Sequence, residues 1–292
     1  MKYFVTACGC VNAYGRNTTE FIQNSSKIKN KDELSNNCLK QFQLYDPSIL
    51  KRFYKLDICC QYLLEAVNQV MKKSGKFPVG TRIGIVVGAT AGPINIQKRF
   101  IKSYQETKGA NPILFKLTTN NIFSGLIALL YDIHDYNMTI FNGYTSAVDA
   151  ANLSLDLLKN HIVDVALVAC VESCSTPLLS GSAALMIEPD DRNDLNLEII
   201  PGKQIHLFSN NDILNYILTR NRFKEYDCIY YNENLVSSIK KDEYLINTDL
   251  NCFGSMGGLL QIIVASQNNA SSILILNRYN EQLSEIKLKR TI

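Results

Sequence analysis

Apolar residues along the chain fall into two kinds of pattern. Residues 82–89, 163–170 and 182–187 are nearly unbroken apolar runs, which are typical of strands buried on both faces of a sheet. Between residues 56 and 71, apolar positions instead recur every three or four residues, which indicates an amphipathic helix. The alternation of buried strands with helices predicts a parallel or mixed sheet that helices cover on both faces.

The segment 145–159 differs from the other predicted helices because it is apolar around most of its circumference. A helix of this kind lies inside a protein. It follows a short predicted strand at 138–141 and leads into the buried strand at 163–170. Further elements are expected at residues 3–11 (a strand), 94–104 and 121–131 (both helices).

After Pro189 the pattern of strands and helices repeats in a shorter form. We therefore divide the chain into an N-terminal half, residues 1–188, and a shortened C-terminal half, residues 189–292, within one continuous unit. The second half is expected to contain a helix near 212–220, a strand at 227–231, an apolar helix at 259–265 that follows the glycine-rich residues 254–258, and strands at 273–276 and 286–288.

Composition excludes several classes of function. The net charge is +3 over 292 residues, without a basic stripe, so a nucleic-acid partner is not expected. No apolar run approaches the roughly 18 residues of a membrane span. Most of the nine cysteines lie in apolar periodic segments, which favours buried, reduced thiols and a cytoplasmic location. The three histidines lie far apart, so we expect no metal, and no cofactor either. Residues 16–52 are polar, and we interpret them as a long surface excursion.

Residues 137–172 carry the candidate chemistry: a strand, a tight turn, a buried helix, and a strand that ends in Glu172. This order resembles the nucleophile segment of the β-ketoacyl synthases, which belong to the thiolase-like family. Their cysteine stands at the mouth of the buried helix, where the helix N-terminus lowers the pKa of the thiol. In the resemblance, Tyr144 stands at the nucleophile position. The alternative is that Tyr144 is an ordinary buried aromatic residue in an unrelated α/β fold.

Other segments match the same family in the same order. Residues 82–92 resemble its second strand and glycine turn, and residues 180–185 its Glu-Gly-Ala-Ala strand without the glutamate. Asn232 and Asn251 stand where the resemblance places the two catalytic histidines, and Ile246 stands near the lysine position. Residues 277–280 replace a Gly-Phe-Gly-Gly turn that helps to shape the oxyanion hole.

The resemblance implies a thiolase-like α/β/α/β/α fold without the residues of condensation, since neither a thiolate nor the two histidines are present. It also implies a chain-length-factor-like subunit that forms a heterodimer with an active ketosynthase in a type II polyketide system, such as an aryl polyene pathway. Acyl carrier protein would then bind through the partner. The dimer strand would be Met138, Thr139, Ile140 and Phe141, and the tunnel candidates are Ile113, Leu114, Phe115 and Leu117.

Two other functions stay open at the level of sequence. The first is a diverged acyltransferase or decarboxylase of the same fold, which would use residual oxyanion donors or a thiol such as Cys174 or Cys252. The second is a scaffold that binds acyl carrier protein.

Overall fold

The computed structural model describes residues 1–25, 56–173, 180–190, 195–206, 226–231, 245–247, 256–267, 269–280 and 282–291. The strands are β1 (Phe4–Asn12), β2 (Ile83–Ala89), β3 (Tyr136–Phe141), β4 (Val165–Glu172), β5 (Gly181–Glu188), β6 (Leu197–His206), β7 (Cys228–Tyr231), β8 (Leu245–Asn247), β9 (Ser272–Tyr279) and β10 (Gln282–Arg290). The helices are α1 (Thr18–Ser25), α4 (Ile58–Ser74), α5 (Ile94–Thr107), α6 (Pro112–Leu117), α7 (Ile122–Tyr131), the 3-10 turn η1 (Gly143–Thr145), α8 (Ser146–Lys159) and α10 (Met256–Ser266).

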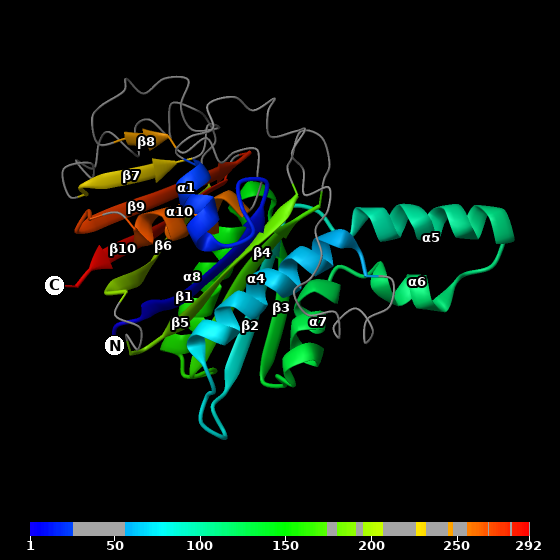
Figure 1. Cartoon of the computed structure of the whole chain (residues 1–292), viewed down its shortest axis with the longest axis horizontal. Helices are drawn as coiled ribbons and strands as arrows, with labels where there is room; N and C mark the ends of the chain where they lie inside the picture. The colour runs from blue at the N-terminus through cyan, green and yellow to red at the C-terminus, as the bar shows by residue number, and fades with distance from the viewer. Residues whose placement is uncertain are drawn as a thin grey trace.

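The described strands form one sheet in the order β3-β2-β4-β5-β1-β6-β10-β9-β7-β8 (Figure 1). The arrangement of the first five strands recurs in the last five: β2 lies parallel to β3 and β4, as β7 lies parallel to β8 and β9. β5 pairs antiparallel with β4 and β1, as β10 does with β9 and β6. The thiolase-like α/β fold class expected from the sequence is confirmed, whereas the division at residues 188 and 189 stays a prediction.

Both faces of the central strands are buried, as their unbroken apolar runs indicate. On β2, Ile85 and Val87 pack in one core with α4 and α7, whereas Val86 packs in a second core with α8 and α10. β4 divides its side chains in the same way, with Leu167 in the first core and Val168 in the second. Because successive side chains of a strand point to opposite faces, α8 and α10 occupy the layer opposite α4 and α7.

The buried helix α8 packs closely against its neighbours, because glycines stand at the contacts. A side chain at Gly88 of β2 would collide with the backbone of Ser146 at the start of α8. A side chain at Gly258 of α10 would come within 2.8 Å of Val148 in α8. These close approaches hold the first turn of α8 at a defined position above the sheet.

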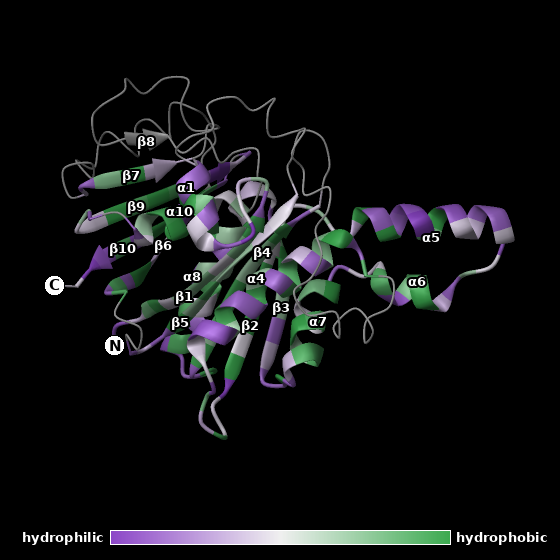
Figure 2. Cartoon of the chain, in the orientation of Figure 1, coloured by the Kyte–Doolittle hydropathy of each residue, from purple (hydrophilic) through white to green (hydrophobic). Residues whose placement is uncertain are grey.

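Two segments contain helices that the sequence does not predict, α1 and α6. The excursion expected at 16–52 was wrong in part, because residues 18–25 form α1, whose Phe21 is fully buried and lies edge-on to Tyr14. The segment before β3 contains α6, which forms a helical hairpin with α5. Figure 1 shows this hairpin projecting beyond the sheet on the side of β3 and α7, and Figure 2 shows a largely hydrophilic α5.

Over the described part of the chain, no helix is long and apolar enough to cross a membrane. Six cysteines lie there, all of them buried and outside any disulfide.

Candidate functional site

The turn between β3 and α8 is the candidate site. Its first residue, Gly143, has a φ of 57°, a left-handed conformation that suits glycine. A side chain at this position would also collide with the aromatic ring of Tyr279, at the end of β9. Glycine is therefore required here for two reasons, its backbone conformation and the close approach of a second element.

The hydroxyl groups of the two residues after Tyr144 fix the turn. The Ser146 hydroxyl accepts a hydrogen bond from the Asn142 backbone N–H at 2.7 Å, and its oxygen lies 2.8 Å from the Gly143 carbonyl, to which it donates. The Thr145 hydroxyl donates to Asp149 at 2.8 Å. These contacts link the end of β3 to the first turn of α8.

Asp149 connects the turn to the second half of the chain. One of its carboxylate oxygens accepts hydrogen bonds from the Asn142 side-chain amide at 2.6 Å and from Thr145. The other oxygen accepts a hydrogen bond of 2.5 Å from Ser284 of β10. Asp149 is half-buried, and these donors compensate its carboxylate for the water that it loses. Asp149 therefore links α8, β3 and β10 beneath the turn.

Tyr144 is half-buried and packs against Tyr279, with the ring centroids 5.2 Å apart and the planes tilted by 56°. Burial raises the pKa of Tyr144 above that of a free tyrosine, and the neighbouring Tyr279 and Glu172 raise it further. Tyr144 is therefore protonated at neutral pH, unlike the thiolate that a condensing enzyme requires at the mouth of this helix.

Glu172 ends β4 and is fully buried. Its carboxylate accepts a hydrogen bond of 3.0 Å from the Thr90 backbone N–H, which follows β2. Because β2 and β4 are parallel neighbours, their carboxyl ends bring this acid beside the turn after β3. No group of three or more potential metal ligands lies together within the described ranges.

The remaining predicted positions are placed only in part. The histidine positions Asn232 and Asn251, like the alternative thiols Cys174 and Cys252, lie outside the described residues. Ile246 belongs to β8. At the end of β9, the buried Asn277 donates to Gln261 of α10 at 3.2 Å.

The tunnel candidates on α6 occupy two different environments. Leu114 and Leu117 are buried, with exposures of 7% and 8%, whereas Ile113 and Phe115 are 49% and 57% exposed. The ring of Phe115 lies 5.8 Å from that of Phe100 on α5. Their joint role in a tunnel therefore stays a prediction, in which the exposed pair would have to meet a partner chain.

Sequence reasoning missed Asp149, Ser284 and the role of Tyr279. An acid in the first turn of a buried helix is a signal that could have indicated Asp149. For Tyr279 the only signal was the resemblance of residues 277–280 to a turn beside the nucleophile. No local sequence pattern shows that Ser284 and Tyr279, which lie more than 130 residues from the turn in the chain, belong to the same site.

The comparisons with known proteins agree with this geometry. The model of the β-ketoacyl synthase N-terminal domain matches residues 10–194, which is more than half of the chain. Among curated proteins, no sequence matches.

Solved structures share the fold at low identity. A type II polyketide synthase acyl-carrier protein in complex with its ketosynthase bound to the hexaketide has 17% identity and a TM-score of 0.81, with 99% of each chain covered. The ishigamide ketosynthase/chain length factor has 14% identity and a TM-score of 0.75 over 100% of both chains. A ketosynthase in complex with its chain length factor from Xenorhabdus doucetiae has 10% identity and a TM-score of 0.73, with 99% of this chain and 98% of that chain covered. The matched model and the turn before α8 together show that this chain belongs to the β-ketoacyl synthase family.

Proposed function

We propose that the chain is a non-catalytic, chain-length-factor-like subunit that pairs with an active β-ketoacyl-ACP synthase and shapes the acyl tunnel of that partner. The observation that carries the proposal is Tyr144, a protonated and half-buried phenol at the mouth of α8. By resemblance, condensing members of the family place their cysteine there.

The chemistry of the site argues against condensation by this chain alone. An acyl chain is held as a thioester by a thiolate, which is both nucleophilic and a good leaving group. A free phenol has a pKa of about 10, and burial raises the pKa of Tyr144 above that value. Tyr144 is therefore a protonated phenol at neutral pH and does not supply the thiolate that condensation requires.

The edge of the sheet supports pairing through β3. This strand ends the described sheet and pairs on one side with β2, and an open edge strand invites pairing with another chain. Nine large hydrophobic side chains are exposed within the described residues, and six of them lie on β3 and the adjoining helices α5, α6 and α7. These six are Ile101, Tyr104, Ile113, Phe115, Leu129 and Met138.

Charge on the α5–α6 hairpin, residues 94–117, indicates the nature of the surface that it meets. The hairpin carries five cations and one anion, Glu106, which pairs with Lys102 at 3.8 Å. The whole chain has a net charge of only +3, so the hairpin holds essentially all of the positive excess. Opposite charges accelerate and direct association, so we propose an acidic surface on the partner. The five cations are Lys98, Arg99, Lys102, Lys108 and Lys116.

The solved relatives support the same arrangement, because two of them are described as pairs of a ketosynthase with a chain length factor and one as a complex with an acyl-carrier protein. We propose that acyl carrier protein reaches this chain through the ketosynthase, in a type II polyketide pathway. An aryl polyene product and a cytoplasmic location stay predictions. No observation favours an independent acyltransferase, since the thiols proposed for it lie outside the described residues.

The proposal is tested by coexpressing the tagged chain with the active ketosynthase of the same gene cluster, followed by size-exclusion chromatography with light scattering. We expect a 1:1 heterodimer that the double variant Leu129→Asp/Met138→Asp abolishes. Ile162→Asp is the matched control, because Ile162 is similarly exposed (49%) but lies in the loop before β4. A stable monomer that does not shift when the ketosynthase is added would contradict the proposal.

A further inference from the structure

The α5–α6 hairpin, residues 94–117, is attached to the rest of the described chain through a narrow base (Figure 1). α5 packs chiefly against α6, and Ile96 is the one residue of α5 that is buried. The 14 residues of α5 carry its far end about 20 Å from this base. A rotation of about 15° at the base would therefore displace the far end by about 5 Å.

Asp57 joins the base of the hairpin to α4. The residue is only 4% exposed. One carboxylate oxygen caps α4 by accepting a hydrogen bond of 3.3 Å from the Cys59 backbone N–H, and the Asn95 side-chain amide donates to the same oxygen at 3.3 Å. The other oxygen accepts a hydrogen bond of 3.0 Å from the Ile96 backbone N–H. A single carboxylate therefore serves the first turns of two helices.

α5 has no acceptor of its own at this place. Pro93 stands at its N-cap position and makes no side-chain hydrogen bond to the helix. Helices commonly begin with a side chain that accepts a hydrogen bond from the second or third N–H of the helix. Ile96 is the third residue of α5, and Asp57 supplies the acceptor from 39 residues earlier in the chain.

The cap of α4 does not account for this arrangement. A cap needs one side-chain oxygen, and serine or asparagine provides it as well as aspartate does. The second oxygen of Asp57 instead meets α5, and Asn95 turns its amide towards the same carboxylate. A further contact fixes the base from the side of α6, because the Gln97 side-chain amide donates to the Thr118 carbonyl at 3.1 Å.

We propose that Asp57 is a positioning residue for the partner surface: it fixes the direction in which the hairpin and its five cations project from the edge of the sheet beside β3. This inference rests on the function proposed above, and it names the residue on which the geometry of the partner contact depends. Charges direct association when they face their counterparts. Loosening the base of the hairpin should therefore slow the encounter with an acidic surface while the fold persists.

The first test is hydrogen exchange of the isolated chain, measured by mass spectrometry. Asp57→Ser separates the two roles of the residue, because a serine hydroxyl caps α4 but offers no second oxygen to α5. Exchange of residues 98–107 should become at least about tenfold faster, whereas exchange in α4 and the urea midpoint should stay close to those of the parent chain. Asn17→Ser is the matched control at the start of α1, where Asn17 accepts from the Glu20 backbone N–H at 2.9 Å. It should leave exchange in the hairpin unchanged.

Asn95→Ala tests the same contact from the side of α5 and leaves the cap of α4 in place. Alanine has a higher helix propensity than asparagine, so propensity alone would slow exchange in α5. We expect the opposite, an acceleration of about threefold, because the lost amide no longer holds the carboxylate.

The second test is the rate of association with the ketosynthase, measured by stopped-flow at low and at high salt. Asp57→Ser should lower the association rate constant by about tenfold at low salt, and the difference should shrink at about 1 M salt, where charges are screened. Removal of an anion would by itself favour an acidic partner. A slower rate is therefore an effect of the position of the hairpin and not of the net charge.

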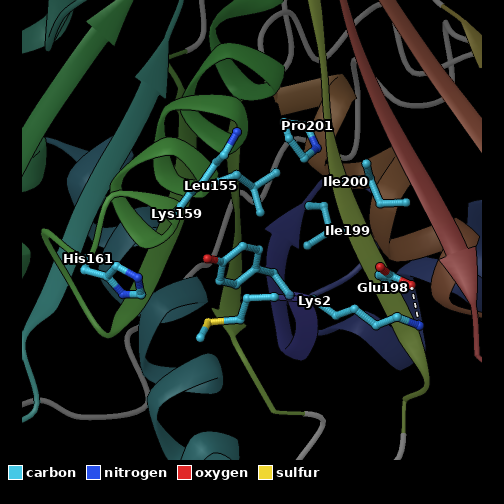
Figure 3. Close-up of a pocket in the computed structure, with 10 residues that line it drawn as sticks. Lys2, Leu155, Lys159, His161, Glu198, Ile199, Ile200 and Pro201 are labelled. Carbon is cyan, nitrogen blue, oxygen red and sulfur yellow. Dashed lines mark ion pairs between the residues drawn. The ribbon is translucent and has the colours of Figure 1, made fainter.

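Lys108→Asn shows whether the position of a cation matters. Lys108 follows α5 at its far end with a left-handed φ of 55°, a conformation that asparagine also adopts. The substitution should slow association by about threefold in the parent chain and by less in the Asp57→Ser background, where the hairpin is no longer fixed. Lys159→Asn is the matched control, because it removes an exposed cation at the C-terminal end of α8, near His161 (Figure 3). It should leave the rate unchanged in both backgrounds.

The proposal is overturned if Asp57→Ser leaves exchange of residues 98–107 as slow as in the parent chain, or accelerates exchange uniformly along the chain. It is also overturned if Asp57→Ser associates with the ketosynthase as fast as the parent chain does, or if Lys108→Asn slows both backgrounds equally. A parent chain that forms no heterodimer contradicts the function proposed above. The exchange measurements use the isolated chain, so they decide independently whether Asp57 holds the hairpin.

Discussion

The ring of Tyr279 packs against the ring of Tyr144, and the two ring centroids are 5.2 Å apart. Tyr279 ends β9 in the second half of the chain, whereas Tyr144 precedes α8 in the first half. Their contact brings two phenol rings to the place where, by resemblance, a condensing enzyme holds its nucleophile. The ring of Tyr279 also occupies the space beside Gly143 that a side chain would need.

Tyr144 should not accept an acyl group. After incubation of the isolated chain with an acyl-carrier-protein thioester, intact-mass spectrometry should show no adduct, because the raised pKa keeps the phenol protonated. The partner ketosynthase, treated in the same way, is the positive control. Tyr144→Cys alone should not restore condensation, since asparagines stand at both predicted histidine positions. A stoichiometric adduct on the peptide of residues 139–150 would contradict this prediction.

Gly143→Ala should lower the free energy of unfolding by about 2 kcal/mol or more, because the left-handed φ and the collision with Tyr279 both penalise a side chain. Urea unfolding measures the change. Gly125→Ala, in α7, is the matched control, because its added methyl group meets no neighbouring atom within 4 Å. This substitution should leave the free energy of unfolding unchanged or raise it by up to about 1 kcal/mol.

A double-mutant cycle separates the two effects at this position. Gly143→Ala should lower the free energy of unfolding by less in the Tyr279→Ala background than in the parent chain, because the collision is removed. The cost of the left-handed backbone conformation remains in both backgrounds. Strictly additive losses would show that the ring of Tyr279 does not press on Gly143.

The double variant Phe115→Ala/Leu117→Ala should lengthen the products of the reconstituted complex, because each methylene admitted to an apolar tunnel is worth on the order of 1 kcal/mol. Phe115 is exposed and should act through the partner, whereas Leu117 is buried within this chain. Mass spectrometry of the products gives the distribution of chain lengths, and co-purification shows whether the heterodimer persists. An unchanged distribution would leave these residues with a structural role only.

Acid should remove a small contribution to stability from the pair of Arg82 and Asp164. Hydrogen bonds from Arg82 lower the pKa of Asp164 to about 2, from an ordinary value of 3.8. A lowered carboxyl pKa stabilises the folded state above the ordinary value, and the contribution is lost as the pH falls from about 4 towards 2. Both side chains are nearly half exposed, so solvent keeps the effect small.

Asp164→Asn should therefore lower the urea midpoint at pH 7, and the difference should be much smaller at pH 2, where about half of the folded-state carboxylate is protonated. Asp156→Asn, at an exposed position of α8, should change neither midpoint. A constant difference between Asp164→Asn and the parent chain at both pH values would show that the ion pair is not the cause.

Elements with a regular pattern of burial could be predicted from the sequence. β2 and β4 appear as unbroken apolar runs because α4 and α7 cover one face and α8 and α10 the other. The sequence of α8 is apolar around most of the helix because α8 is buried against strands of both halves of the sheet. In each case, the surroundings of the element leave a local periodic record in the sequence.

Elements without such a record were missed. α1 buries a single residue, Phe21, within a polar segment, so it shows no periodic apolar face. β6 contains Pro201 and Gly202, which interrupt its alternation, and the register of its partner β10 shifts between Ser284 and Ile286. A side chain at Gly202 would collide with the Glu285 backbone. The glycine in β6 is therefore required by contact with β10, a strand distant in sequence, and it interrupts the alternating pattern by which a strand is predicted.

The sequence by itself determined the order of the central strands and helices, the family resemblance, and the tyrosine before the buried helix. Only the tertiary structure decided that Tyr279 packs on Gly143, that Ser284 reaches Asp149, and that β3 lies at the edge of the described sheet. Local patterns record whether a face of an element is buried, because burial repeats with the period of the helix or strand. They do not record which distant residues meet, because those contacts depend on how the two halves of the chain pack together.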